Sequence, residues 1–174
     1  MGSILDVIGA RRSIRKMTEQ PIPEETLRKV LEAGRLAPSW KNGQCWRLIV
    51  VKDPEKRALI ARESSRGEVM TVAPVVIVGC ALPEQSGFLN DQSYYLVDMG
   101  IVLEHIILEA TAQGLATCWI GIFNESLIKE SLGIPDHVRV VNMVIMGYPD
   151  EERNPRPRLA LEEIAFVDGW PKET

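Results

Sequence analysis

The sequence contains few of the residues that most often bind metals or form disulfides. Its 174 residues include two histidines, His105 and His137, and three cysteines, Cys45, Cys80 and Cys118. The cysteines are odd in number, widely spaced and without a C-x-x-C pair, so neither a disulfide framework nor a zinc site is indicated. Neither histidine has a partner ligand at metal-binding spacing. We expect no metal centre, and a reducing cytoplasm fits the free thiols best.

Long apolar runs and a surplus of positive charge are also missing. The longest stretches without a charged residue are 69–83 and 110–124, each 15 residues long, whereas a membrane-spanning helix needs about 18. The 20 basic and 24 acidic residues give a net charge of −4, which does not attract nucleic acid. The sequence begins without a basic and then apolar signal segment. We therefore expect a cytoplasmic protein that binds neither membranes nor nucleic acid.

Four common catalytic motifs are absent as well. The sequence has no G-x-x-x-x-G-K-[ST] loop, no G-x-G-x-x-G after a strand, no G-x-S-x-G elbow and no H-E-x-x-H helix. The enzyme classes built on these motifs are therefore set aside. What remains is a distributed pattern of basic residues and irregular loops.

Length and composition predict one globular domain, residues 1–174. The length is close to the roughly 150 residues of a typical domain, and 45% apolar with 25% charged residues can bury a real core. Apolar periodicity, caps and prolines predict helices over 4–12, 23–37, 54–62, 91–113 and 125–132, and strands over 46–52, 74–81, 116–120 and 138–146. Strands separated by helices favour an α/β or α+β sandwich with a central sheet covered by helices.

Basic residues gather near both ends of the chain. Arg11, Arg12 and Arg15 surround Ser13 where the first helix ends, and their guanidinium groups could fork around a phosphate dianion. The same residues could instead form a solvated face, since cations favour the C-terminal end of a helix dipole. The segment 154–158 (N-P-R-P-R) supports the phosphate interpretation, because its prolines hold an extended backbone that sends both arginines to one side.

Two further segments each allow a structural and a functional interpretation. The loop 38–46 (P-S-W-K-N-G-Q-C-W) is either a plain helix-to-strand connection or a polar-edged, flat-faced wall for a planar heterocycle. The segment 114–121 (G-L-A-T-C-W-I-G) is either a buried strand or a backbone that glycine brings close to a ligand. Local sequence leaves both alternatives open.

Taken together, these motifs carry a resemblance. R-R-S-I-R at 11–15, A-P-S-W-K-N-G-Q-C-W at 37–46, G-L-A-T-C-W-I-G at 114–121, G-Y-P at 147–149 and P-R-P-R-L at 155–159 occur in this order. Over nearly the whole chain the sequence resembles the nitroreductase family of FMN flavoenzymes. The resemblance implies an α+β fold, a three-layer α/β/α sandwich around a mixed sheet. It also implies a homodimer with one FMN per subunit in a groove at the subunit interface.

The resemblance also implies roles for individual residues. The FMN phosphate and ribityl end would be held by Arg11, Arg12, Ser13, Arg156 and Arg158. Arg15 matches a basic residue near the N1 and O2 edge of the ring. Pro38, Ser39, Trp40 and Asn42 would come from the partner subunit and line the ring. The amides of Ile120 and Gly121 would face N5 and O4.

The implied chemistry needs no catalytic acid or base from the protein. Reduced flavin is negatively charged near N1 and O2, so Arg15 would stabilise it and raise its reduction potential. We therefore expect an FMN-dependent oxidoreductase that uses NAD(P)H to reduce nitroaromatics, quinones or related acceptors by ping-pong hydride transfer. One alternative is a flavin carrier or sensor with little reductase activity. Another is a related enzyme that modifies flavin or dehalogenates a substrate.

Three departures from the family pattern stand out. The family loop usually runs N-x-Q-P-W, whereas this chain has Cys45 in place of proline, which predicts a looser loop and a thiol near the site. Trp40 is bulky for its position and could stack beside the substrate or narrow the pocket. The segment 83–90 leaves little room for the helical lid of longer members.

Overall fold

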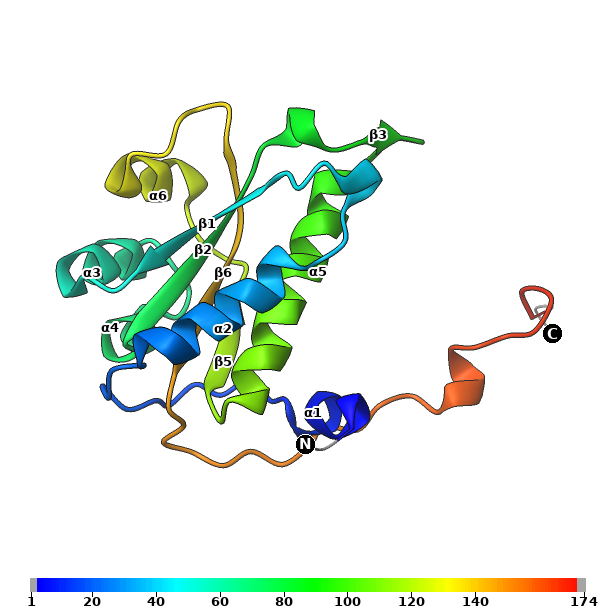
Figure 1. Cartoon of the computed structure of the whole chain (residues 1–174), viewed down its shortest axis with the longest axis horizontal. Helices are drawn as coiled ribbons and strands as arrows, with labels where there is room; N and C mark the ends of the chain where they lie inside the picture. Colours follow the sequence, from blue (N-terminus) through cyan, green and yellow to red (C-terminus); the bar gives the residue numbers. More distant parts are fainter. Residues whose placement is uncertain (1–2, 172–174) are drawn as a thin grey trace.

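The computed structural model describes residues 3–171 and has a four-stranded sheet between two layers of helices (Figure 1). The strands lie in the order β1–β2–β6–β5, and every neighbouring pair is antiparallel. Their bounds are β1 Trp46–Val51, β2 Val75–Ala81, β5 Ala116–Ile120 and β6 Arg139–Gly147. The sequence predicts a mixed sheet, whereas these four strands pair only in the antiparallel sense. Within residues 3–171, the one parallel pairing is the isolated bridge between Ser13 and Thr117, beside β5.

Helices cover both faces of this sheet, as a three-layer sandwich requires. One face packs against α2 (Glu24–Arg35) and α5 (Tyr94–Ala112). The other packs against α3 (Pro54–Arg62), α4 (Gly67–Val72) and α6 (Glu125–Leu132). Every residue of β2 is buried, and alternate side chains enter the two separate cores. A strand covered on both faces reads as a continuous apolar run, which explains V-V-I-V-G-C-A in this segment.

Local capping chemistry defines several helix ends as the sequence predicts. Ser3 and Asp6 form a capping box at the start of α1 (Ile4–Ala10). The Asp53 side chain accepts a hydrogen bond from the Lys56 N–H at the start of α3. Asn124 caps α6, which ends where Gly133 takes a left-handed φ of 67°. These ends follow from neighbouring residues alone, and the predictions for them are confirmed.

Shorter elements depart from the prediction. The long helix begins at Tyr94 rather than near Asp91, because Asn90 and Asp91 adopt positive φ angles in the turn of a small hairpin. The hairpin pairs β3 (Phe88–Leu89) with β4 (Gln92–Ser93). Three 3-10 helices, η1 (Trp40–Asn42), η2 (Pro83–Gln85) and η3 (Leu161–Glu163), and the helix α4 were not predicted. Each is too short to show a periodic pattern.

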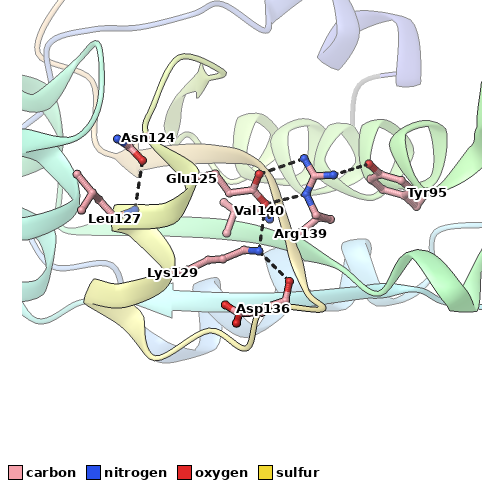
Figure 2. A network of polar contacts seen from close by, with 8 residues as sticks. All are labelled: Tyr95, Asn124, Glu125, Leu127, Lys129, Asp136, Arg139 and Val140. Carbon is pink, nitrogen blue, oxygen red and sulfur yellow. Dashed lines mark hydrogen bonds and ion pairs between the residues drawn. The ribbon is translucent and has the colours of Figure 1, made fainter.

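An ion-pair network fastens α6 to the sheet and to α5 (Figure 2). The Glu125 carboxylate accepts hydrogen bonds from the Arg139 guanidinium at 2.9 and 3.0 Å, and from the Val140 N–H at 2.9 Å. Lys129 lies 3.6 Å from the same carboxylate. Arg139 also reaches the hydroxyl of Tyr95 at 3.5 Å. The Arg139 hydrogen bonds are the main cause that lowers the pKa of Glu125.

None of the helices within residues 3–171 is long and apolar enough to cross a membrane.

We predict that Glu125→Ala lowers the free energy of unfolding by roughly 1–2 kcal/mol, because it leaves a half-buried N–H and a guanidinium without their acceptor. Glu130→Ala is the matched control, since Glu130 is an exposed carboxylate on the same helix. Chemical denaturation measures both. A lowered pKa means that the Glu125 contribution is present at neutral pH and is lost as the pH falls through that pKa. Equal effects of the two variants would contradict this role.

Candidate functional site

The two arginine-rich ends of the chain line one cavity of about 600 Å³. From the N-terminal side it is lined by Ile8, Gly9, Arg11, Arg12, Ser13 and Arg15. From the segment after β6 it is lined by Glu151, Glu152, Arg153, Asn154, Pro155, Arg156 and Arg158. In Figure 1 the segment after β6 runs beside α1 before it leaves the body of the protein. All six residues assigned to the phosphate end and the N1 edge of FMN therefore share one cavity.

Backbone pairing holds these two segments together. The Ile14 N–H donates to the Thr117 carbonyl of β5 at 3.0 Å, so the N-terminal segment lies along the sheet edge. The Thr18 N–H donates to the Tyr148 carbonyl, and the Asp150 N–H to the Lys16 carbonyl, each at 2.9 Å. Residues 13–18 are thus held between β5 and the segment that follows β6. The cavity walls are positioned by main-chain hydrogen bonds rather than by the arginine side chains.

The cavity carries a surplus of positive charge. It is lined by six arginines and two glutamates. Arg153 pairs with Glu151 at 2.7 Å, and Arg11 lies 3.9 Å from Glu104. Within residues 3–171, no carboxylate oxygen lies within 4.0 Å of the four other guanidinium groups, those of Arg12, Arg15, Arg156 and Arg158.

Two buried nitrogen atoms at this cavity also have no acceptor. They are the Nε atoms of Arg12 and Arg15, which form no hydrogen bond within the described residues. A buried donor normally has a partner, because leaving it unsatisfied costs free energy. A multivalent anion such as a phosphate monoester would supply oxygen acceptors and neutralise the surplus charge. The donor set therefore fits a phosphate-bearing ligand.

Sequence reasoning did not assign every residue of the cavity wall to the site, and the polar residues it left out are Glu151, Glu152, Arg153 and Asn154. Their only sequence signal is the polar run E-E-R-N directly before P-R-P-R. Glu151 accepts hydrogen bonds from the Arg153 guanidinium and from the Arg15 N–H. The hydrogen bonds from Arg153, and to a smaller extent that from the Arg15 N–H, lower the pKa of Glu151 to about 2. The carboxylate is therefore ionised at neutral pH.

The loop predicted to line a flavin ring does not belong to this cavity. The segment 38–42 lies at the other end of α5 from α1 (Figure 1), with Trp40 packed on Tyr94, the first residue of α5. None of Pro38, Ser39, Trp40 and Asn42 lines the cavity. The Trp40 N–H donates to the Asp98 carboxylate at 2.8 Å. A single chain does not bring these four residues to the arginines, so their predicted position depends on a second subunit.

Ile120 and Gly121 lie at the end of β5, outside the cavity wall. Thr117 of the same strand bridges Ser13, so about 10 Å of extended strand separates the cavity edge from Ile120. Ile120 is buried and Gly121 is exposed. The backbone that follows β5 is therefore open to solvent within one strand length of the arginines.

The thiol predicted near the site, that of Cys45, is closed to solvent. Cys45 is fully buried, and its Sγ donates to the Asp98 carboxylate at 3.5 Å. Burial, followed by the contact with Asp98, raises the pKa of Cys45 to about 11. The residue that replaces the family's proline thus contributes to a buried polar cluster. Its thiol is protonated and inaccessible.

Trp40 packs within its own chain. Its ring centroid lies 4.1 Å from that of Tyr94, with the planes tilted by 45°. Gly87 allows this packing, because a Cβ atom there would come within 2.4 Å of the indole. In place of a helical lid, the segment that contains Gly87 forms η2 and the two-stranded hairpin. This short segment and Trp40 together form one compact corner beside α5.

The fold and the cavity define an α+β sandwich protein with a basic cavity built from both ends of its chain. The chain belongs to the nitroreductase family, whose sequence model matches residues 8–67 and 61–148.

Curated relatives and a solved structure agree with this membership. The chain is 33% identical over 195 residues to an NADH dehydrogenase of Thermus thermophilus, covering 90% of this chain and 91% of that protein. It is 29% identical over 181 residues to the FMN reductase (NAD(P)H) of Bacillus subtilis, covering 94% and 73%. A nitroreductase family protein from Clostridium novyi NT superposes with a TM-score of 0.83 at 38% identity, covering 86% and 87%. The predicted three-layer sandwich is confirmed.

Proposed function

We propose that this protein is an FMN-dependent oxidoreductase that takes hydride from NAD(P)H and passes it to a nitroaromatic, quinone or related acceptor. Residues 1–174 would then be one FMN-binding domain, working in the cytoplasm. The similarity to an FMN reductase and to an NADH dehydrogenase supports the cofactor and the electron donor. The observation that carries the proposal is the cavity lined by four guanidinium groups without a carboxylate partner in the described part of the chain. Two of these groups also contain a buried Nε donor without an acceptor there.

The cavity residues would divide the work of holding FMN. Arg11, Arg12, Arg156 and Arg158 neutralise the phosphate, and Ser13 contacts the ribityl end. Arg15 lines the cavity and follows the Ser13 bridge to β5 by two residues, so its charge would stabilise the reduced ring at the N1 and O2 edge. The backbone at Ile120 and Gly121 orients the N5 and O4 edge. FMN supplies the hydride chemistry, and the protein contributes binding, orientation and electrostatics.

A second subunit would complete the site. The exposed apolar surface of one chain supports a homodimer: Leu96 and Val97 of α5 are 50% and 53% exposed. The segment after β6 exposes six further large apolar residues, Leu159, Leu161, Ile164, Phe166, Val167 and Trp170. Apolar surface of this extent marks an interface in most water-soluble proteins. In such a dimer, Pro38, Ser39, Trp40 and Asn42 of one subunit line the ring held by the other.

We predict that Arg12→Ala, Arg156→Ala and Arg158→Ala each weaken FMN binding about 10- to 100-fold, the loss expected for one charge-assisted hydrogen bond. Arg11→Ala should act in the same direction. Fluorescence titration of the apoprotein with FMN measures the effect, and circular dichroism checks that the fold is retained. Arg28→Ala on the exposed side of α2 is the control. Unchanged flavin content in all four cavity variants would refute the phosphate assignment.

Anaerobic stopped-flow mixing separates an oxidoreductase from a flavin carrier. We predict that NADH or NADPH bleaches the flavin absorbance of the holoprotein within a single turnover, and that a quinone restores it. A carrier or sensor would leave the bound flavin oxidised under the same conditions. Product analysis of the acceptor distinguishes nitroreduction or quinone reduction from dehalogenation. A wild-type protein that takes up no FMN at all would end the proposal.

We predict that Gly100→Arg converts the dimer into a monomer and abolishes tight FMN binding. A Cβ atom at Gly100 meets nothing within 4 Å in the single chain, and arginine favours a helix more than glycine does. The variant should therefore fold and fail only at an interface along α5. Size-exclusion chromatography with light scattering measures the mass, with Glu130→Arg on α6 as the control. A monomeric wild-type protein, or a dimeric Gly100→Arg variant, would contradict the proposed assembly.

A further inference from the structure

A carboxylate occupies an unexpected place in the basic cavity. Glu151 lines the same wall as the six arginines, and its side chain is only 16% exposed. A negative charge beside a phosphate site opposes the binding of a dianion by simple electrostatics. If Glu151 belongs to the site, it must therefore favour FMN binding in some other way that offsets this repulsion.

The contacts of Glu151 commit both of its oxygens. Oε1 accepts from the Arg15 N–H at 2.6 Å and from the Arg153 Nε at 2.7 Å. Oε2 accepts from the second Arg153 donor at 3.0 Å. Arg153 thus neutralises the carboxylate in a two-point ion pair, which is the geometry with the best-defined orientation. Glu151 and Arg153 are thus paired with each other at the cavity wall.

The contact with Arg15 completes the attachment of the N-terminal segment. Successive N–H groups of an extended chain point to opposite sides. The Ile14 N–H faces β5, where it donates to the Thr117 carbonyl. The Arg15 N–H faces the segment after β6, where its acceptor is a side chain, that of Glu151, 136 residues away in sequence. The backbone around Arg15 is therefore held on both sides. Ile14 attaches it to β5, and Glu151 attaches it to the segment after β6.

We propose that Glu151 is a positioning residue, which holds the Arg15 backbone and the Arg153 guanidinium so that the Arg15 guanidinium faces the bound flavin. The inference rests on the proposed function, since it assigns Glu151 a role at the same site. Within residues 3–171 the Arg15 guanidinium has one hydrogen bond, a long contact of 3.5 Å with the Ser13 carbonyl, and its buried Nε has no acceptor. Because these contacts hold the side chain only weakly, its direction depends on the backbone that Glu151 fixes. Because Arg153 is paired with Glu151, the other arginines would bind the phosphate.

The neighbouring Glu152 provides a matched comparison. It lines the same cavity and carries the same charge, but within residues 3–171 its side chain makes no hydrogen bond or ion pair. Glu151→Ala and Glu152→Ala each remove one negative charge from the cavity. Only the first also removes the acceptor of the Arg15 N–H and the partner of Arg153.

The two variants have different expected effects on FMN affinity, measured by fluorescence titration of the apoproteins. Glu151→Ala should raise the Kd about tenfold, the loss of one charge-assisted hydrogen bond. Glu152→Ala should leave the Kd unchanged or lower it, because a repulsive charge is gone. If Glu151 acts only through its charge, both variants bind FMN more tightly. That result would overturn the proposal.

The midpoint potential of the bound flavin tests the role at Arg15 directly. A displaced Arg15 stabilises the reduced ring less, so Glu151→Ala should lower the potential, whereas Glu152→Ala should not. Loss of stability alone would leave the potential at its wild-type value, and this outcome also overturns the proposal. Glu151→Gln keeps an oxygen acceptor for the Arg15 N–H and should recover most of the wild-type potential. A glutamine variant as defective as the alanine variant would contradict the contact with Arg15.

The failure of the inference is distinct from the failure of the proposed function. A wild-type protein that binds no FMN ends both. A wild-type protein that binds FMN, together with a Glu151→Ala variant that binds it equally well at the same potential, refutes the positioning role alone. The unfolding transition of each apoprotein shows whether the variants are folded under the titration conditions.

Discussion

The main-chain pairing of residues 13–18, with Thr117 of β5 and with residues 148–150 after β6, is the interaction on which the candidate site depends. It joins the N-terminal segment to β5 on one side and to the segment after β6 on the other. Without these hydrogen bonds, the arginines at the two ends would lie on separate surfaces and no cavity would form. Ile14 and Met17, both buried, anchor this pairing in the core formed with α3, α4 and α6. The geometry of the site therefore depends on the edge of the sheet at β5 remaining folded.

The charge distribution follows from this pairing. A chain with a net charge of −4 has no general attraction for anions, yet it concentrates six arginines around one cavity. The repulsion among these cations is partly relieved by Glu151 and Glu104, and the remaining surplus is available to a phosphate group. Local placement rather than net charge decides which ligand this surface attracts. In the proposed function, the phosphate of FMN would match that surplus, and its ring would lie by the open backbone after β5.

Much of the fold could be predicted because its signals lie within a few residues. The caps at Ser3 and Asn124, the positive φ of Gly133 and the buried run of β2 each follow from neighbouring side chains. The prediction fails where an element is too short for periodicity, as in α4 and the hairpin around Asn90. The surroundings of Cys45 could not be predicted either, because no local signal shows that Asp98, 53 residues later, supplies the acceptor for its thiol.

The sequence by itself determined the elements, their caps and the two basic segments, because each of these depends on residues close together in the chain. Only the tertiary structure decided that the two segments meet around one cavity and that Glu151 is fastened to Arg15 across 136 residues. It also decided that Trp40 packs on Tyr94 at the far end of α5. These outcomes depend on the order of strands in the sheet. Strand order is a property of the whole chain, which no local pattern encodes.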